Sequence, residues 1–397
     1  MHILVVNSGS SSIKFSMFET SSREPQTLYD GEISGIGTPA AHLAIHGIDH
    51  PVPSDPSAAD PIAATRIILD TVSAPRMPPV EAVGYRVVHP GPKLSDHQKI
   101  TPEVLHDLAE AVSFAPLHDP AVLDVIREGQ KHFPEVSHYA CFDTVFHLTM
   151  PEEATTYPIP KSYRDQGVRR YGFHGLSCES IVRQLRASNL PFPKRMVICH
   201  LGSGCSVTAL IDGQSVDTSM GLTPTGGVVM GTRPGDLDPG LLLYLLRQQQ
   251  GDRESATAAV EKLLNHDAGM IALTSMPNDV KAIREASAKG NKEATLALKV
   301  FTRSLTKAIG GFSWLLGGLD AIVFAGGIGE HDPLTRYETL ACLEPLGVAI
   351  NSALNQQKTN GVRAISASDC RTTVFVIPAQ EDLTIAMHVD RLARSNQ

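Results

Sequence analysis

Three short turns rich in glycine and serine have the composition of phosphate-binding loops. The first is 'NSGSSSIK' at 7–14, and the others are 'HLGSG' at 200–204 and 'GGIGEH' at 326–331. Hydroxyl groups and backbone amides hydrogen-bond phosphate oxygens, and lysine adds a positive charge. Glycine lets the backbone approach a ligand closely. One such turn is usually a plain hairpin, but three in one chain favour a protein that handles phosphate.

A fourth segment, 'VVMGTRPGDLDPG' at 228–240, places Arg233 inside a turn of glycine and proline. A rigid turn can aim a guanidinium group at an anion. Asp236 and Asp238 can hold that guanidinium or cap the next helix. The alternative is a surface loop with a structural ion pair, and this motif alone leaves the two interpretations about even.

Several other side chains have types suited to catalysis. Asp143 lies in the apolar run 'CFDTVFH', where a carboxylate needs a partner or a metal ion. His174 in 'RRYGFHGLS' and His118 in 'APLHDP' are candidates too, although a lone histidine is usually structural. Glu381 and Asp382 follow a strand-like run near the end of the chain, where acidic residues either bind Mg²⁺ or cap a helix.

The elements that must position these groups alternate between strands and helices. Periodicity and capping residues predict a hairpin, two further strands, four helices and a loop-rich excursion. They lie at 3–18 (hairpin), 82–89 and 321–327 (strands), 101–112, 119–133, 238–250 and 291–316 (helices), and 37–61 (loops). Asp332-Pro333 predicts the start of another helix, and 374–386 reads as a strand followed by the acidic residues. This alternation is typical of the α/β class.

The opening pattern occurs a second time in the middle of the chain. The segment 196–213 repeats the order of apolar strand, Gly/Ser turn and alternating strand, and Gly202-Ser203 aligns with Gly9-Ser10 at an offset of 193 residues. A repeat of half the chain length indicates two related domains. The alternative is a chance alignment of two common hairpins.

Composition narrows the class of protein. The 397 residues include 42% hydrophobic and 19% charged residues, and 34 basic against 42 acidic residues give a net charge of -8. This balance argues against nucleic acid or an anionic membrane as the main partner. The six cysteines form no CxxC pair, and we expect a reduced, soluble, cytoplasmic protein without a leader or a membrane span. Walker A, Rossmann and HExxH motifs are absent from the sequence.

Taken together, these motifs resemble the acetokinase family of the acetate and sugar kinase/Hsp70/actin superfamily. The matching segments occur in the family's order: 'NSGSSSIKF', 'GYRVVHPG', 'APLHDP', 'FDTVFH', 'RRYGFHGLS', 'CHLGSGCSV', 'DTSMGLTPTGGVVMGTRPGDLDP', 'FAGGIGEH' and 'IPAQEDLTIA'. The resemblance implies transfer of the ATP γ-phosphoryl group to acetate with Mg²⁺, or Mn²⁺ in its place, giving ADP and acetyl phosphate. It also implies a homodimer.

The implied fold is α/β, with two duplicated actin-like (ribonuclease H-like) domains around a central cleft. The N-terminal domain would comprise 1–148, with the terminal helix 382–397 packing back on it, and the nucleotide-binding domain would comprise 149–381.

The resemblance also implies roles, residue by residue. Arg86 would hold the acyl substrate, Asp143 is the catalytic aspartate, and Arg233 and His174 would stabilise the phosphoryl transition state. Asn7 and Glu381 match the magnesium site. His118 is a supporting residue, and the pocket for the acetate methyl group comprises Val88, Leu117, Phe173 and Pro224. The nucleotide contacts would be Lys14, Ser10, Ser12, His200, Leu201, Gly202, Ser203, Gly204, Asp279, Val280, Lys281, Gly327, Ile328, Gly329, Glu330 and His331.

The acceptor carboxylate is already a nucleophile at neutral pH, so the reaction needs no strong base. We therefore expect Asp143 to orient Arg86 or a metal-bound water rather than abstract a proton.

The chain departs from the family pattern at the rim of the site. It reads His-Pro-Gly-Pro at 89–92 and Arg-Pro-Gly-Asp at 233–236, and Lys281 stands where the family has arginine. Lysine cannot stack or fork as arginine does, so nucleotide preference is open. Propionate or another short acid is the alternative acceptor, with butyrate ranked low. An inactive nucleotide-binding protein of the superfamily is the more distant alternative.

Overall fold

The structure is a computed structural model that describes residues 1–9, 12–21, 24–48, 57–114, 119–358 and 361–395. The chain forms two compact units, each built on its own sheet. Unit 1 comprises residues 1–145, 175–180 and 380–397, and unit 2 comprises residues 146–174 and 181–379. The resemblance implies domain boundaries after residues 148 and 381, and these boundaries remain a prediction.

Unit 1 contains a sheet in the order β4-β3-β2-β1-β5-β7-β6. Its strands are β1 (His2–Ser8), β2 (Ser12–Glu19), β3 (Gln26–Ser34), β4 (His42–His46), β5 (Ala82–Val87), β6 (Gln98–Lys99) and β7 (Ser137–Phe142). Its helices are α1 (Pro61–Val72), α2 (Pro102–Glu110), α3 (Asp119–His132) and α15 (Glu381–Ser395), together with the first turns of α6 (Gly175–Ala187). Strands β1, β5 and β7 are parallel, whereas β1, β2 and β3 form an antiparallel meander.

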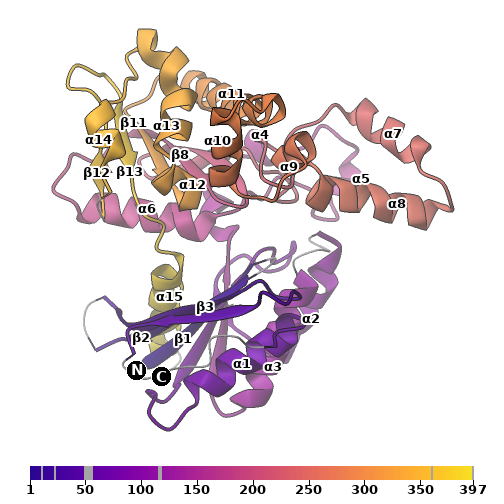
Figure 1. Cartoon of the computed structure of the whole chain (residues 1–397). Helices are drawn as coiled ribbons and strands as arrows, with labels where there is room; N and C mark the ends of the chain where they lie inside the picture. The colour runs from indigo at the N-terminus through magenta and orange to yellow at the C-terminus, as the bar shows by residue number, and fades with distance from the viewer. Residues whose placement is uncertain (10–11, 22–23, 49–56, 115–118, 359–360, 396–397) are drawn as a thin grey trace. The chain divides into compact units, whose positions relative to one another are not determined.

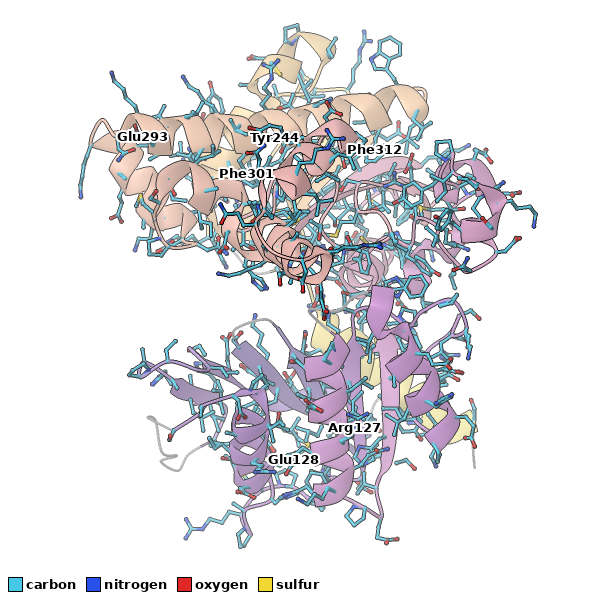
Figure 2. All side chains as sticks on the ribbon, turned by 90° about the vertical axis from the view of Figure 1, so that its right-hand side faces the viewer. Arg127, Glu128, Tyr244, Glu293, Phe301 and Phe312 are labelled. Carbon is cyan, nitrogen blue, oxygen red and sulfur yellow. The ribbon has the colours of Figure 1, made fainter. Side chains whose placement is uncertain are left out.

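Both faces of this sheet are covered, which explains the continuous apolar run of β1. Leu4 and Val6 belong to the core shared with α1, α2 and α3, whereas Ile3 and Val5 pack toward α15 and the start of α6. In Figure 1 α1, α2 and α3 lie together, and α15 stands apart from them beside β1 and β2. Arg66 on α1 donates to Glu128 on α3 at 2.7 Å, and Figure 2 labels Glu128 on that helix.

Unit 2 contains a sheet in the order β10-β9-β8-β11-β13-β12. Its strands are β8 (Arg195–Leu201), β9 (Cys205–Ile211), β10 (Gln214–Thr218), β11 (Ala321–Ala325), β12 (Arg363–Ala364) and β13 (Thr373–Val376). Its helices are α4 (Glu152–Thr155), α5 (Lys161–Arg164), α7 (Pro239–Gln248), α8 (Arg253–Lys262), α9 (Gly269–Thr274), α10 (Val280–Ala288), α11 (Lys292–Leu315), α12 (Gly326–His331), α13 (Pro333–Leu340) and α14 (Ser352–Gln356), with the last turns of α6. Figure 2 follows α11 from Glu293 past Phe301, which is fully buried, to Phe312.

The two sheets repeat one topology, which confirms the predicted duplication. In unit 1 the order β3-β2-β1-β5-β7 consists of an antiparallel meander and then two parallel strands. In unit 2 the order β10-β9-β8-β11-β13 has the same directions. The two Gly/Ser turns therefore occupy equivalent hairpins.

One expectation was wrong. The segment 37–61 was expected to be loop-rich, but His42–His46 forms β4, which pairs with β3 in antiparallel register from Asp30↔His46 to Ser34↔His42. Its residues His-Leu-Ala-Ile-His contain an apolar run of only three residues, which is too short to stand out beside the surrounding proline and glycine. The backbone of β3, not the local sequence, determines this strand.

A group of metal-type ligands lies within unit 1 at α6 and α15, formed by His97, Glu179 and His388. His388 Nε2 lies 2.9 Å from the Glu179 carboxylate, and Nδ1 of His97 accepts the Phe142 backbone N–H at 3.0 Å. A neutral His97 therefore carries its proton on Nε2, the nitrogen left for a metal, which argues against a metal site here. Burial, with help from His388 and Arg391, lowers the pKa of His97 to about 3.

This neutral histidine predicts acid sensitivity. Below the ordinary histidine pKa of about 6.5, His97 is protonated in the unfolded chain but stays neutral in the folded protein. The free energy of unfolding therefore falls as the pH drops from about 6.5 toward 3. His97→Asn keeps an acceptor for the Phe142 N–H but cannot titrate. Urea unfolding at several pH values should show that the free energy of unfolding of this variant depends less steeply on pH than that of the wild type. The difference should be up to about 1.4 kcal/mol per pH unit. An unchanged dependence of the free energy of unfolding on pH in His97→Asn contradicts the prediction.

Gly84 on β5 marks the closest approach of α15 to the sheet. An added Cβ there would lie 2.7 Å from Val389 Cγ2 and 2.8 Å from Ile385 Cγ2. We expect Gly84→Ala to destabilise the protein by about 1–3 kcal/mol through overpacking, and Val389→Ala to relieve part of that loss. Gly311→Ala on α11 is the matched control, because no described atom outside its own helix lies within 4 Å of the new Cβ. Chemical denaturation that ranks both variants alike would refute this account.

Candidate active site

The polar residues of unit 1 gather where its parallel strands end. Asn7 is the penultimate residue of β1, Arg86 that of β5, and Asp143 directly follows β7. The register pairs Val6 with Tyr85 and Arg86 with Cys141, so these three positions share one edge of the sheet. Carboxyl ends of parallel strands are where α/β proteins bind ligands. Glu381 and Asp382 reach the same cluster from the first turn of α15.

A buried ion pair joins Arg86 and Asp143. Asp143 is fully buried, and both Nε and Nη2 of Arg86 donate to its Oδ2, Nε at 3.0 Å. Glu381 lies 4.0 Å from the guanidinium on another side. Burial opposes the charge on Arg86, but Asp143 and Glu381 outweigh it, so the pKa of Arg86 is raised. The pair thus holds a permanent cation at the sheet edge.

Asn7 is oriented by carboxylates that the sequence assigned only in part. Its Nδ2 donates to Glu381 Oε2 at 3.2 Å and to Asp382 Oδ1 at 3.0 Å, and Asp382 also accepts from Ser16 at 2.7 Å. The Asn7 Oδ1 then accepts from Arg86 at 3.4 Å. Burial raises the pKa of Asp382, although the hydrogen bonds from Asn7 and Ser16 oppose this. Ser16 is thus a positioning residue that the motif search did not single out, and Asp382, predicted as a metal ligand or a helix cap, orients Asn7.

This donor set fits a hard divalent cation. The cluster offers amide and carboxylate oxygens, which Mg²⁺ and Mn²⁺ prefer. Three carboxylates, Asp143, Glu381 and Asp382, outnumber the two cations that act on them, Arg86 and Lys14. A dication would compensate that excess, and Asn7 and Glu381 are the residues that would hold it.

In unit 2, Gly204 faces both predicted transition-state groups. An added Cβ would lie 3.3 Å from Arg233 Nη1 and 3.4 Å from His174 Nε2. Arg233 Nη1 is held by the Pro224 carbonyl at 2.9 Å. His174 Nδ1 lies 3.0 Å from the Ser206 hydroxyl, and its ring stacks on His200 at 4.1 Å. These contacts leave Nε2 of His174 and the guanidinium of Arg233 directed toward the 'HLGSG' turn.

His147, the last residue of 'FDTVFH', supports His174 indirectly. Its Nε2 donates to the Phe173 carbonyl at 2.9 Å, and its Nδ1 lies 2.9 Å from the Ser215 hydroxyl. Burial lowers the pKa of His147 to about 4, so it stays neutral in this role. His174, which follows Phe173 in the chain, adopts a left-handed backbone with φ of 58°. Such a conformation is costly for a residue other than glycine, and the fixed Phe173 peptide helps to hold it.

Unit 2 also contains a cavity of about 840 Å³ beside the turns of 'HLGSG' and 'GGIGEH'. This volume falls in the range of small-molecule sites. The cavity is lined by Gly202, Ser203, Asn278, Asp279, Val280, Lys281, Arg284, Gly327, Ile328, His331, Asp332, Pro333, Leu334, Gln356 and Lys358. Three segments predicted to bind nucleotide, distant in sequence, therefore converge on one cavity.

Some residues of those predicted segments lie elsewhere. Leu201 is buried in β8, Gly329 is buried in α12, and His200 stacks on His174. Glu330 points its carboxylate at the backbone N–H groups of Gly326 and Ala379. The Asp279 side chain caps α10 by accepting from the Lys281 N–H at 2.9 Å, so it reaches the cavity as a helix cap.

Arg284 is a cavity residue that sequence reasoning missed. It donates to Asp332 at 3.0 Å, to Glu338 at 2.6 Å and to Thr335 at 2.9 Å. It thereby ties α10 to α13 across the cavity wall. Burial opposes its charge, but Glu338 and Asp332 raise the pKa of Arg284. The sequence signal that could have identified Arg284 is its position on α10, one helical turn after the predicted residue Lys281.

The remaining predicted residues are placed as follows. Lys14 is exposed on β2 and Ser12 is half-buried, whereas Val88, Phe173 and Pro224 are buried. Three predictions, Ser10, Leu117 and His118, lie outside the described residues.

No helix among the described residues is both long and apolar enough to cross a bilayer.

Comparison with known proteins places this arrangement in a family. The Acetokinase family model matches residues 2–387. An acetate kinase of Halothermothrix orenii is 37% identical over 407 residues and covers 100% of both chains. An acetate kinase of Deinococcus radiodurans is 39% identical over 390 residues, which is 97% of this chain and 96% of the relative.

Solved structures agree. The acetate kinase of Porphyromonas gingivalis has a TM-score of 0.84 at 32% identity and covers 99% of both chains. A propionate kinase of Francisella tularensis has a TM-score of 0.88 at 32% identity, covering 98% of this chain and 99% of its own. These likenesses confirm the predicted fold class, two duplicated actin-like α/β domains. The chain therefore belongs to the acetokinase family of phosphotransferases that use a carboxyl group as acceptor.

Proposed function

We propose that this chain transfers the γ-phosphoryl group of ATP to acetate, giving acetyl phosphate and ADP, and catalyses the reverse reaction. The observation that carries the proposal is the unit 1 cluster, where Arg86 is fixed on Asp143 and flanked by Asn7 and Glu381. A guanidinium held in this way can bind a small carboxylate. Its neighbours supply oxygen ligands for a metal ion that accompanies phosphate.

Asp143 acts as a positioning residue in this proposal. Its Oδ2 accepts two N–H groups of Arg86 and so fixes the direction of the guanidinium. The acceptor carboxylate is ionised at neutral pH, and no proton need be removed from it. Arg86 would bind one acetate oxygen while the other attacks the γ-phosphorus and the bond to the β-phosphate oxygen breaks. Val88, Phe173 and Pro224, with Leu117, are the proposed apolar contacts of the methyl group.

Unit 2 would supply the nucleotide site and the groups that stabilise the transferring phosphoryl. Charge develops on its equatorial oxygens, so catalysis depends on positioned cations and N–H donors. Arg233 and His174 Nε2, both beside Gly204, are such donors. The cavity bordered by Gly202, Ser203 and Gly327 would bind ATP, with Lys281 near its wall. Ser10, Ser12 and Lys14 remain proposed phosphate contacts, and His118 a supporting group.

Magnesium is proposed from the donor chemistry of the unit 1 cluster. Asn7 and Glu381 would hold it, with Asp382 orienting Asn7. The ion would neutralise phosphate charge during transfer. Mn²⁺ has similar ligand preferences and is the proposed substitute.

Propionate is the second candidate acceptor. The Francisella propionate kinase matches this fold as closely as the Porphyromonas acetate kinase does, so the likeness favours both acids. Propionate differs by one methylene, and a hydrophobic pocket discriminates one methylene by roughly 10–200-fold. Direct comparison of the acids decides between them.

Acyl phosphate formation is measured by trapping with hydroxylamine. We expect hydroxamate from acetate, less from propionate, little from butyrate and none without acid, with ATP compared against GTP.

Arg233→Ala should lower kcat by roughly 10²–10³-fold, because one transition-state donor is lost. Arg303→Ala, at an exposed position on α11, is the matched control and should retain activity. Absence of hydroxamate with every acid sinks the kinase proposal, and an unchanged rate in Arg233→Ala removes that residue from its role.

We also propose a homodimer, as the family resemblance implies, and a cytoplasmic location. None of the residues of α7 is buried, although it carries Leu241, Leu243, Tyr244 and Leu246 at 36–56% exposure. Figure 2 labels Tyr244 on this helix. A second copy of the chain covering α7 would remove this apolar surface from water.

Sedimentation velocity tests the dimer. The wild-type chain should sediment as a dimer, and Leu243→Asp should shift the population toward monomer because it would place a charge in the contact. Leu296→Asp is the control, since Leu296 is 53% exposed on α11, away from α7 in the sequence. A monomeric wild-type protein would falsify the proposed assembly, and a dimeric Leu243→Asp variant would remove α7 from the interface.

A further inference from the structure

Glu330 belongs to a helix that borders the cavity, yet its side chain does not line the cavity. Gly327, Ile328 and His331 of α12 contribute to the wall. The Oε1 atom of Glu330 instead accepts two backbone N–H groups, from Gly326 at 3.0 Å and from Ala379 at 3.1 Å. One carboxylate oxygen therefore joins the start of α12 to Ala379, which lies 49 positions after Glu330 in the chain.

Ala379 occupies a special place in the chain. It is the last residue of unit 2, and the chain continues through Gln380 into α15 of unit 1, which begins at Glu381 (Figure 1). Strand β13 pairs with β11 up to Val376, and the Ile377 N–H still bonds to the Phe324 carbonyl at 3.0 Å. Beyond this point the backbone leaves the sheet.

Two side chains hold the departing segment within unit 2. Gln184 of α6 donates to the Pro378 carbonyl at 2.9 Å, and Glu330 accepts from the Ala379 N–H. Of these two contacts, the one from Glu330 comes from the helix that borders the cavity. A displacement of α12 therefore reaches Ala379 directly, whereas a displacement of α6 reaches Pro378.

The backbone of α12 is fixed at its other end. Arg336, which is 1% exposed, donates to the carbonyls of Gly329 at 2.7 Å and Glu330 at 3.0 Å. At the start of the helix, Gly326 packs so closely on β8 that an added Cβ would lie 2.7 Å from the Leu201 carbonyl oxygen. A helix held at both ends moves as one body, so the Glu330 carboxylate follows any shift at Gly327 or Ile328.

We propose that Glu330 is a positioning residue that couples occupancy of the unit 2 cavity by nucleotide to the segment Ile377–Gln380, and thereby to the placement of Glu381. This inference rests on the proposed function, in which the cavity binds nucleotide and Glu381 holds Mg²⁺. Glu330 acts through the backbone N–H of Ala379, without contact to the nucleotide.

Three variants test the coupling. Glu330→Ala removes both hydrogen bonds, and Glu330→Gln retains an amide oxygen that can accept them. Asp252→Ala is the matched control, because Asp252 also uses its carboxylate to accept a backbone N–H, from Ser255 at 2.8 Å, on α8 of the same unit. Thermal unfolding identifies the folded variants to be compared, and Glu330→Gln keeps the test open should Glu330→Ala fail to fold.

The kinetic readout separates positioning from binding. In Glu330→Ala we expect the Mg²⁺ concentration for half-maximal hydroxamate formation to rise roughly 10-fold and kcat to fall roughly 10-fold, in line with the loss of other indirect metal-site supports. Calorimetric affinity for ADP in the presence of EDTA should match the wild type. Glu330→Gln should require nearly the same Mg²⁺ concentration as the wild type, and the control Asp252→Ala should require the same concentration. Wild-type Mg²⁺ dependence in folded Glu330→Ala, or an equal loss of ADP affinity, overturns the proposal.

Hydrogen exchange tests the coupling apart from catalysis. ADP should slow exchange of the Ala379 amide in the wild-type chain but leave it unchanged in Glu330→Ala. The same ADP effect in both proteins overturns the inference. A wild-type chain that makes no acyl phosphate yet shows ADP-dependent protection at Ala379 refutes the kinase proposal and leaves the coupling supported.

Discussion

The buried ion pair between Arg86 and Asp143 is the constraint on which the unit 1 site depends. Removing two charges from water costs several kcal/mol for each ion, and only good geometry with further hydrogen bonds repays it. Here both donors converge on one carboxylate oxygen, and Asn7 and Glu381 add contacts around the guanidinium. Because a lone charge at this position would be more costly still, the pair fixes the side-chain directions of the whole cluster.

The duplicated fold explains how two different sites arise on one framework. Each unit presents the carboxyl ends of parallel strands next to a Gly/Ser hairpin. In unit 1 those ends carry Asn7, Arg86 and Asp143, which make a charged cluster. In unit 2, β11 instead runs straight into the short helix α12, and a cavity remains beside it. The strand order is shared, and the residues that follow each strand determine the chemistry.

Much of this could be predicted from local patterns. The hairpins, the helices that begin after Asp238, Asn291 and Asp332, and the duplication follow from periodicity, capping residues and an internal match. Strand β4 could not be predicted, because its pairing with β3 and not its own composition makes it a strand.

Side-chain direction was the second limit on prediction. Glu330 and Asp279 lie in segments correctly associated with the cavity, yet both carboxylates bond to backbone N–H groups. Arg284 was missed because its role comes from contacts with Asp332, Thr335 and Glu338, which lie about fifty residues away in sequence. A motif identifies a segment, whereas the tertiary contacts decide which of its side chains face the ligand.

The acidic residues of both units share a feature that bears on mechanism. Asp143 holds Arg86, Asp382 holds Asn7, and Glu330 holds two backbone amides. None of these carboxylates is arranged as a base, and the proposed acceptor, already an anion, requires none. The chemical difficulty that remains is to bring an anionic nucleophile to an anionic phosphate, which is a problem of charge and position. A framework in which carboxylates orient cations and amides is suited to that problem, because its acidic groups position cations and N–H donors.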